Sequence, residues 1–248
     1  MWRWPPGSPD SLFAQVVDTI AIAVISGKVG EGAIIPNEGG LGISVSRSVY
    51  REALKYLSAK GLIEARPRSG TRAAAASHWN LLDPDVLRWS LAARPDEKFI
   101  RDLYELRSFI EPNAARLAAL RRTDAQALAI RKAYEGMAAV EPYSEFNIQS
   151  DVLFHECIID ASGNPAMRCL KSVVTTTMMW SMQLQLGRTR EDYLSALSDH
   201  RRVAEAIEQQ EAERAYSVMS ALVQDALADT LNMFRRRRAV KPFKEAAE

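Results

Sequence analysis

The chain has little of what marks a secreted or membrane-spanning protein. It holds two cysteines and three histidines among 248 residues. No apolar run approaches the roughly 18 residues of a membrane-spanning helix, and the opening Met1-Trp-Arg-Trp-Pro-Pro lacks the apolar core of a signal peptide. Cys157 and Cys169 fall in helical apolar patterns and are expected to be reduced. These features predict a cytoplasmic protein with no membrane partner.

Catalytic signatures are also missing from the sequence. We find no Gly-rich phosphate loop, no nucleophile elbow and no catalytic Cys–His pairing. The residues are 47% hydrophobic and 25% charged, which allows a large core and a soluble surface. The net charge of +1 is unevenly spread, because residues 1–78 carry nine Lys and Arg against six Asp and Glu. The N-terminal third is therefore the basic end of the chain.

A helix with two different faces is predicted over residues 44–57. Its apolar side chains recur at helical spacing and can face a core: Val45, Val49, Ala53, Leu54 and Leu57. Its start and opposite side present Ser46, Arg47, Tyr50 and Arg51. Because arginine donates paired hydrogen bonds to guanine and the free N–H groups of a helix start bind phosphate, this helix suits a DNA major groove. An ordinary solvated helix face is the alternative.

A basic hairpin is predicted directly after this helix. A turn at Gly61 leads into a short strand over 62–65 and a hairpin tip over 68–70. Gly70 and three nearby arginines are expected to meet a phosphate backbone or a minor groove: Arg66, Arg68 and Arg72. Helix, Gly turn and basic hairpin in this order are the layout of a winged helix-turn-helix domain.

These residues also carry a family resemblance. The run Val45-Ser-Arg-Ser-Val-Tyr-Arg-Glu-Ala-Leu54, followed by Leu57, Gly61-Leu-Ile63 and Gly70, resembles the DNA-reading module of the GntR family of bacterial transcription regulators. The lead-in Gly27…Gly32…Ile35-Pro-Asn-Glu38 is similar to that family as well. The resemblance implies that the protein binds double-stranded operator DNA as a homodimer.

One interval departs from the family pattern. The family places a full helix between the Glu of the lead-in and the Val-Ser-Arg, whereas this chain has Gly39-Gly-Leu-Gly-Ile-Ser44. Each glycine costs a helix roughly 1 kcal/mol relative to alanine. We therefore expect the first helix of the helix-turn-helix to be short or irregular.

The remaining pattern is mostly helical. Apolar periodicity predicts a first helix over 11–26 and later helices over 96–121, 123–139, 143–162, 165–187, 190–209 and 211–237. We expect a mainly α protein in three parts. These are a winged helix-turn-helix with a small β-hairpin wing over 8–76, a linker with a short helix over 77–95, and an all-helical bundle over 96–238.

Within the predicted bundle, Asp151 and His155 are four residues apart. This spacing places both side chains on one face of a helix, so both can reach one ion or one ligand. A simple Asp–His hydrogen bond is the alternative. His200 is the other histidine of the bundle, since His78 falls in the linker.

Residues 80–235 resemble the ligand-binding domain of the fatty-acid-regulator (FCD) subfamily of GntR. The matching segments are Leu103-Tyr-Glu-Leu-Arg-Ser-Phe-Ile-Glu-Pro112, Asp151…Phe154-His155 with Ala161-Ser-Gly-Asn164, and His200…Ala206-Ile207. The resemblance implies a divalent metal, held by one Asp and usually three His, that helps to bind a small organic acid. By position, Asp151, His155 and His200 match three of those ligands, and Zn²⁺, Ni²⁺ or Mn²⁺ would suit them.

The last histidine of that ligand set is missing here. Leu222 stands at its expected position, and Asp225, one turn further along, could replace it. The three polar groups could also bind a ligand without metal. The loss of this histidine, together with Trp79-Asn-Leu-Leu-Asp83, resembles the galactonate-operon repressor branch, which implies a sugar acid as effector.

Two further residues are candidates for contact with the effector. Arg107 offers two parallel donors to a carboxylate, although an ion pair with Glu111 one turn on is the alternative. Asn164 is the second candidate, or else a helix-end residue. The run Arg235–Arg238 could meet nucleic acid, but basic residues are also favoured at the C-terminal end of a helix.

Together these patterns predict a repressor that a small carboxylate modulates. A ligand whose binding free energy differs by ~1.4 kcal/mol between the DNA-competent and the incompetent state would change operator occupancy tenfold. One alternative is a regulator whose sensor domain has lost its metal and mainly dimerises. The other is a non-haem metal enzyme, because two His and one carboxylate also bind iron in oxygenases. We expect no enzymatic activity.

Overall fold

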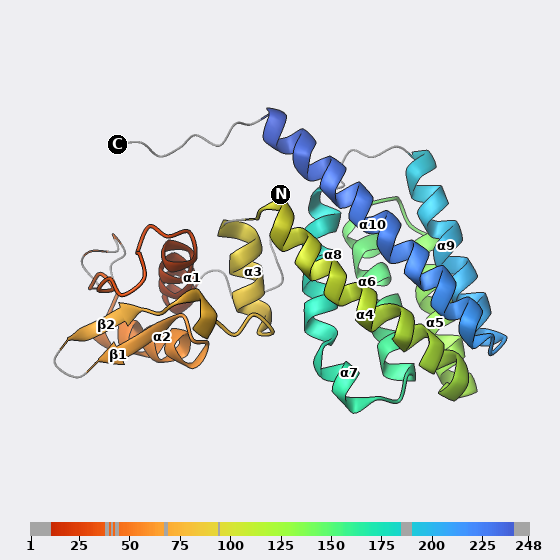
Figure 1. Cartoon of the computed structure of the whole chain (residues 1–248), viewed down its shortest axis with the longest axis horizontal. Helices are drawn as coiled ribbons and strands as arrows, with labels where there is room; N and C mark the ends of the chain where they lie inside the picture. Colours follow the sequence, from red (N-terminus) through yellow and green to blue (C-terminus); the bar gives the residue numbers. More distant parts are fainter. Residues whose placement is uncertain are drawn as a thin grey trace. The chain divides into compact units, whose positions relative to one another are not determined.

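The computed structural model divides the chain into two compact units, Met1–Pro95 and Asp96–Glu248. It describes residues 11–37, 40, 42, 45–66, 69–93, 95–184 and 190–240. The N-terminal unit contains α1 (Leu12–Ile25), α2 (Arg47–Ala59), β1 (Ile63–Arg66), β2 (Gly70–Ala73), a 3₁₀ turn (Ala76–His78) and α3 (Pro84–Ala93). The predicted mainly α fold with a small hairpin wing is confirmed (Figure 1).

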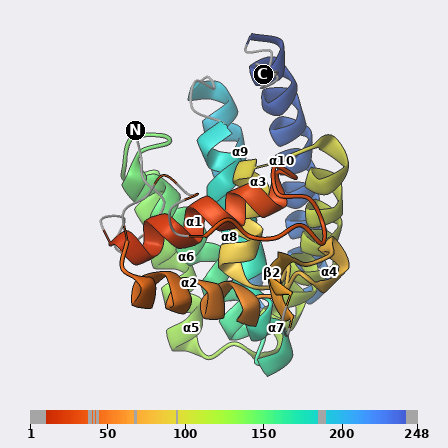
Figure 2. The same ribbon diagram turned by 90° about the vertical axis from the view of Figure 1, so that its left-hand side faces the viewer.

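In the N-terminal unit, α1 packs against α2, and α2 lies beside the hairpin (Figure 2). Ser11 caps α1, whose apolar stripe is buried at Val16, Val17, Ile20 and Val24. The strands β1 and β2 pair antiparallel, with Ile63 opposite Ala73 and Arg66 opposite Gly70. Of the expected irregular segment over 39–44, only Gly40 and Gly42 lie among the described residues, so that expectation stays a prediction.

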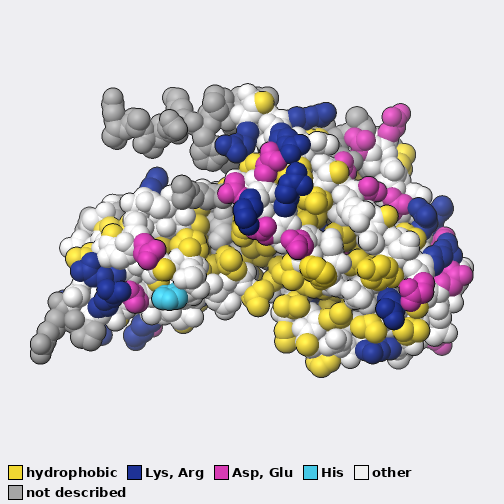
Figure 3. All heavy atoms as spheres, in the orientation of Figure 1, with side chains coloured by type: hydrophobic (Ala, Val, Ile, Leu, Met, Phe, Trp, Pro, Cys, Tyr) yellow, Lys and Arg dark blue, Asp and Glu magenta, His cyan; other side chains and the backbone are white. Residues whose placement is uncertain are grey.

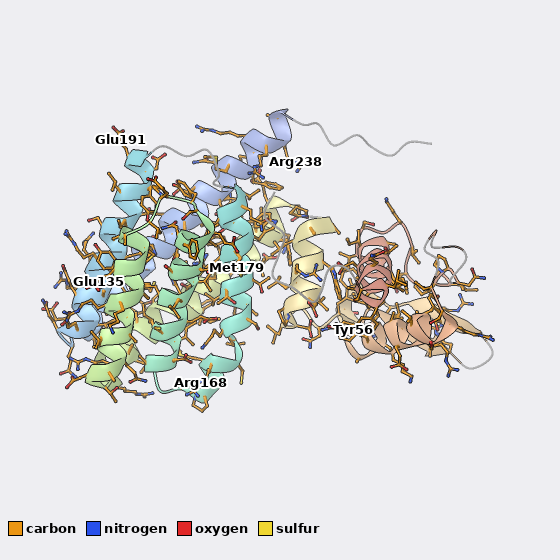
Figure 4. All side chains as sticks on the ribbon, turned by 180° about the vertical axis from the view of Figure 1, so that it is seen from behind. Tyr56, Glu135, Arg168, Met179, Glu191 and Arg238 are labelled. Carbon is orange, nitrogen blue, oxygen red and sulfur yellow. The ribbon has the colours of Figure 1, made fainter. Side chains whose placement is uncertain are left out.

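The helix α3 packs on α1 and α2. Val86 and Trp89 are buried in the same core as these helices. The Asp18 carboxylate of α1 accepts hydrogen bonds from Trp89 Nε1, at 2.6 Å, and from Arg88. On the α2 side, Lys60 pairs with Asp83 and Asp85, and the Tyr56 hydroxyl donates to Asp85 (Tyr56 is labelled in Figure 4). The segment predicted as a linker helix is therefore held by polar and apolar contacts to α1 and α2.

Gly61 ends α2 in a conformation that favours glycine. Its φ is +79°, and its N–H and that of Leu62 donate to Ser58 and Leu57 carbonyls, the Schellman pattern. A Cβ atom at this position would lie 2.1 Å from the His78 carbonyl oxygen. We expect Gly61→Ala to lower the free energy of unfolding by more than about 2 kcal/mol in urea titrations, because a left-handed residue costs roughly 1–2 kcal/mol before any clash.

Gly70→Ala is the matched control for this prediction. Gly70 has nearly the same φ, +78°, but a Cβ atom there would meet nothing within 4 Å. Gly70→Ala should lower the free energy of unfolding only by the cost of the left-handed backbone conformation, roughly 1–2 kcal/mol. Equal losses for the two variants would contradict the role assigned to the close approach of Gly61 and His78.

The C-terminal unit is a bundle of helices around α4 (Glu97–Arg121). The others are α5 (Asp124–Ala138), α6 (Glu145–Ala161), α7 (Pro165–Cys169), α8 (Lys171–Leu184), α9 (Arg190–Glu208) and α10 (Ala212–Val240). Figure 4 shows this bundle from behind, with Glu135 on α5 and Met179 on α8. Among the described residues, α4 contacts α6, α8, α9 and α10, and no described helix is long and apolar enough to cross a membrane.

The prediction of a single helix over 165–187 is wrong. The segment forms two helices, because α7 ends at Leu170, whose N–H donates to the Met167 carbonyl in a tight turn. After this turn, α8 packs against α6. Helical periodicity alone did not reveal this turn, which contains neither Gly nor Pro.

Basic side chains gather over the end of α10 and the start of α4 (Figure 3). Several of them are engaged within the bundle: Arg235 donates two hydrogen bonds to Glu97, Arg237 donates to the Gln183 carbonyl, and Arg238 lies over the Phe234 ring. These contacts favour the interpretation of the run as a helix end over a nucleic-acid contact.

Candidate functional site

The start of α2 presents the predicted basic face. Ser46 caps the helix, and its Oγ accepts from the Val49 N–H at 3.4 Å. Arg47 and Arg51 lie one turn apart, and both are exposed. Neither arginine forms an ion pair or hydrogen bond with any described residue. Their guanidinium groups are therefore available to an external partner.

Other predicted DNA contacts are placed differently. Tyr50 is buried, because it shares the core face of α2 with Ala53 and Leu57, and its hydroxyl donates to the Pro36 carbonyl. Arg72 donates to the Gly32 carbonyl at 2.7 Å, and so it holds the lead-in segment against β2.

The tip of the wing is only partly described. Arg66 is exposed and paired with the neighbouring Glu64. Gly70 is exposed, with a positive φ. Arg68 lies outside the described residues. Of the predicted DNA contacts, Ser46, Arg47 and Arg51 are therefore exposed at the start of α2, whereas Tyr50 and Arg72 form contacts within the N-terminal unit.

A cavity of about 300 Å³ opens in the C-terminal unit. Side chains from α4, α6, α8, α9 and α10 line it. Part of the wall is apolar, with Met178, Met182 and Leu222. This volume is at the lower end of what small-ligand sites use.

Three of the predicted residues converge in this cavity. Asp151 Oδ1 lies 3.4 Å from His155 Nε2 and 3.2 Å from His200 Nε2. One ligand atom from each residue can be chosen so that all three lie within 4.8 Å of one another. The buried ring of Phe154 contacts both imidazoles edge-on, at centroid distances of 5.5 and 5.2 Å. The expected Asp–His–His cluster is therefore assembled from α6 and α9.

Each imidazole is held at the nitrogen that faces away from Asp151. His200 Nδ1 lies 2.7 Å from the Ala196 carbonyl oxygen, and His155 Nδ1 contacts a carboxylate oxygen of Glu111. In metal sites the outer nitrogen of a ligating His commonly donates to such an acceptor, which fixes the ring and leaves the other nitrogen for the metal. The donor set and its anchors fit a divalent metal such as Zn²⁺, Ni²⁺ or Mn²⁺.

The buried carboxylates and the His155 imidazole stabilise one another in their charged forms. Burial opposes ionisation of Asp151, but the two imidazoles outweigh it and hold the pKa of this carboxyl far below its usual range. Burial also disfavours a charged His155, yet the Glu111 charge and the hydrogen bonds to Asp151 and Glu111 raise the pKa of His155 to about 9. A metal at His155 would therefore displace a proton.

Arg107 forms the ion pair that the sequence offered as the alternative, and its contact with an effector stays a prediction. Its Nε donates to Glu111 Oε1 at 2.5 Å, and the same side chain lines the cavity. Burial opposes the charge of Glu111, but Arg107 and His155 lower the pKa of Glu111 to about 2. Sequence reasoning considered Glu111 only as a partner for Arg107 and missed its contact with His155, which lies 44 residues further along the chain.

The remaining candidates differ in position. Leu222 is buried and lines the cavity at the place expected for a further ligand, and Asp225 also lines it but is not part of the three-residue cluster. Asn164 does not line the cavity. Its side chain caps α7 by accepting from the N–H groups of Ala166 and Met167, which agrees with the helix-end alternative.

Comparison with known sequences identifies both units. Residues 12–72 match the bacterial regulatory proteins of the gntR family, and residues 102–225 match the FCD domain. The chain belongs to the GntR family. The predicted resemblance is confirmed, and so is the GntR-type winged helix-turn-helix with a helical C-terminal domain. The protein is therefore a DNA-binding transcription regulator of the GntR/FCD type, and not an enzyme.

Relatives within the GntR family span most of this chain. The galactonate operon transcriptional repressor of Escherichia coli K12 is 29% identical over 81% of this chain and 89% of its own length. The regulator YieP of the same organism is 30% identical over 88% of this chain and 97% of its own. A GntR structure from Streptococcus agalactiae covers 88% of this chain and 99% of its own, at 27% identity and a TM-score of 0.50. Lar of Listeria monocytogenes, at 15% identity and a TM-score of 0.63, shares the fold.

Proposed function

We propose that this protein is a repressor that binds operator DNA as a homodimer in the cytoplasm and is modulated by a small carboxylate, such as a sugar acid. The cavity of the C-terminal unit would take a divalent metal through Asp151, His155 and His200. The observation that carries this proposal is the convergence of both His Nε2 atoms on Asp151 while both Nδ1 atoms are anchored. The similarity to the galactonate operon repressor supports the choice of a sugar acid.

The charges of the cavity favour a metal-assisted site for an anion. Arg107 lines the cavity, but it already pairs with Glu111, so its charge is largely compensated. Asp151 adds a negative charge next to the two imidazoles. A bound divalent ion would supply a Lewis acid for a ligand carboxylate at this point. Arg107 would orient the carboxylate from the α4 side.

In a dimer, the two copies of α2 would meet two half-sites of a near-palindromic operator. Ser46, Arg47 and Arg51 would contact DNA from the helix, and Arg66, Arg68 and Gly70 from the wing. The effector would act by favouring a state in which the two modules no longer match the operator.

A thermal-shift panel tests the sensor proposal. We expect an aldonate or a related hydroxy acid at about 100 times its dissociation constant to stabilise the protein by ~2.7 kcal/mol, a shift of several degrees. The shift should need added Zn²⁺, Ni²⁺ or Mn²⁺ and should disappear with a chelator. If no acid of the panel shifts the melting temperature with any metal, the proposal is contradicted.

Leu222 favours a second candidate function. Because an apolar side chain occupies the place of a further ligand, the bundle could bind an acid without metal or could serve mainly for dimerisation. A shift by an acid that is unchanged by chelator would support metal-free binding. A dimer that responds to neither acid nor metal would support the dimerisation role.

A further inference from the structure

Glu111 is a buried carboxylate with two partners of different kinds. Its side chain is 1% exposed, one turn from Arg107 on α4. Oε1 accepts from Arg107 Nε, and Oε2 contacts His155 Nδ1. Apart from this ionic contact with each other, neither Glu111 Oε2 nor His155 Nδ1 has a hydrogen-bond partner among the described residues. The carboxylate therefore joins the candidate effector-binding arginine to a candidate metal ligand.

The chemistry of these partners fixes what position 111 must offer. A guanidinium has donors only, so the atom that faces Arg107 has to accept. The tautomer of an imidazole follows from the hydrogen bond at its other nitrogen. A carboxylate can accept on both sides, so it keeps a proton of His155 on Nδ1, and Nε2 is then the nitrogen that gives up its proton to bind a metal.

We propose that Glu111 is a positioning residue that sets the tautomer of His155 for metal binding, and that Arg107 enforces this by fixing which atom of residue 111 faces the histidine. The inference rests on the proposed metal site. It adds that the arginine near the effector and the metal ligand are tied through one side chain, with no contact between Arg107 and His155 needed.

The isosteric change Glu111→Gln gives a sharp test. Arg107 would draw the amide oxygen towards itself, and the amide NH₂ would then point at His155 Nδ1. That nitrogen would have to accept, so the proton would move to Nε2, where it blocks the metal. We expect E111Q to weaken Zn²⁺ affinity by about 10–100-fold, the range typical of outer-partner changes. Glu105→Gln on the exposed side of the same helix is the control and should bind zinc like the wild type.

A second variant separates positioning from loss of structure. In R107M/E111Q no guanidinium dictates the amide orientation, so the amide can turn and its oxygen can accept from His155 Nδ1–H. Zinc affinity should then return to within about threefold of that of R107M alone. If E111Q instead damages the fold, R107M/E111Q should bind zinc more weakly than R107M alone. Urea titration of each variant measures the free energy of unfolding and reports such damage independently.

Nitrogen NMR of the histidine rings gives a readout that does not depend on the zinc affinity. In zinc-loaded wild type, His155 should carry its proton on Nδ1, and in metal-free E111Q on Nε2. A wild-type Nε2–H tautomer, or equal zinc affinity of E111Q and wild type, would overturn the inference and leave the metal site standing. If wild-type protein takes up no zinc at all, the proposed metal site fails and the inference fails with it.

Discussion

Replacing both Arg47 and Arg51 by alanine should weaken operator binding by at least about 30-fold. Each arginine that reads a base edge with paired hydrogen bonds contributes about 1–3 kcal/mol. Both side chains are exposed at the start of α2, and neither is held by another described residue. Fluorescence anisotropy on a duplex selected from random DNA by the wild-type protein would measure the loss.

Lys55→Ala is the matched control for the double variant. Lys55 is an exposed cation on the same helix, but it lies two turns from the helix start and pairs with Glu52 at 2.8 Å. Its removal should change the affinity by no more than a few-fold. Binding of the double variant within about threefold of wild type would remove the assignment of α2 as the recognition helix.

His155→Ala should lower Zn²⁺ affinity by more than about 100-fold, the second large effect that we expect. Loss of a direct ligand should exceed the 10–100-fold typical of a partner behind it. The substitution removes one of the three atoms that converge at the cluster, and it also leaves Glu111 without its contact at Oε2. Calorimetric titration of metal-stripped protein would measure the change.

The third histidine provides the control. His78 lies in the 3₁₀ turn of the other unit, outside the Asp–His–His cluster. We expect His78→Ala to bind zinc with the stoichiometry and affinity of the wild type. A similar loss in both variants would indicate non-specific binding to histidine rather than a built site.

The fold was largely predictable because its signals are local. Helical periodicity and caps placed most helices within a few residues of their observed bounds, and Asp151 and His155 came from i, i+4 spacing alone. Tyr50 was misplaced since its position on α2 borders both faces, and only the tertiary contact with Pro36 shows that it points inward. The contact of Arg72 was also missed, because the Gly32 carbonyl that it binds is 40 residues away.

The candidate site could be predicted only in part from the residues. His200 was predicted as a metal ligand through the family resemblance, because no local sequence pattern links it to α6. Glu111 shows the limit most clearly. Its spacing from Arg107 predicted an ordinary helix ion pair, and that pair is present. Its second contact, with His155, depends on how α4 and α6 pack, and no sequence spacing encodes that contact.

The central claim is that Asp151, His155 and His200 form a metal centre in the sensor cavity. The most direct test is a calorimetric titration of metal-stripped, full-length protein with Zn²⁺. We predict one ion per chain in the wild type and in His78→Ala, with binding strongly weakened in His155→Ala and His200→Ala. No uptake by the wild type, or equal uptake by the wild type and His155→Ala, would contradict the claim.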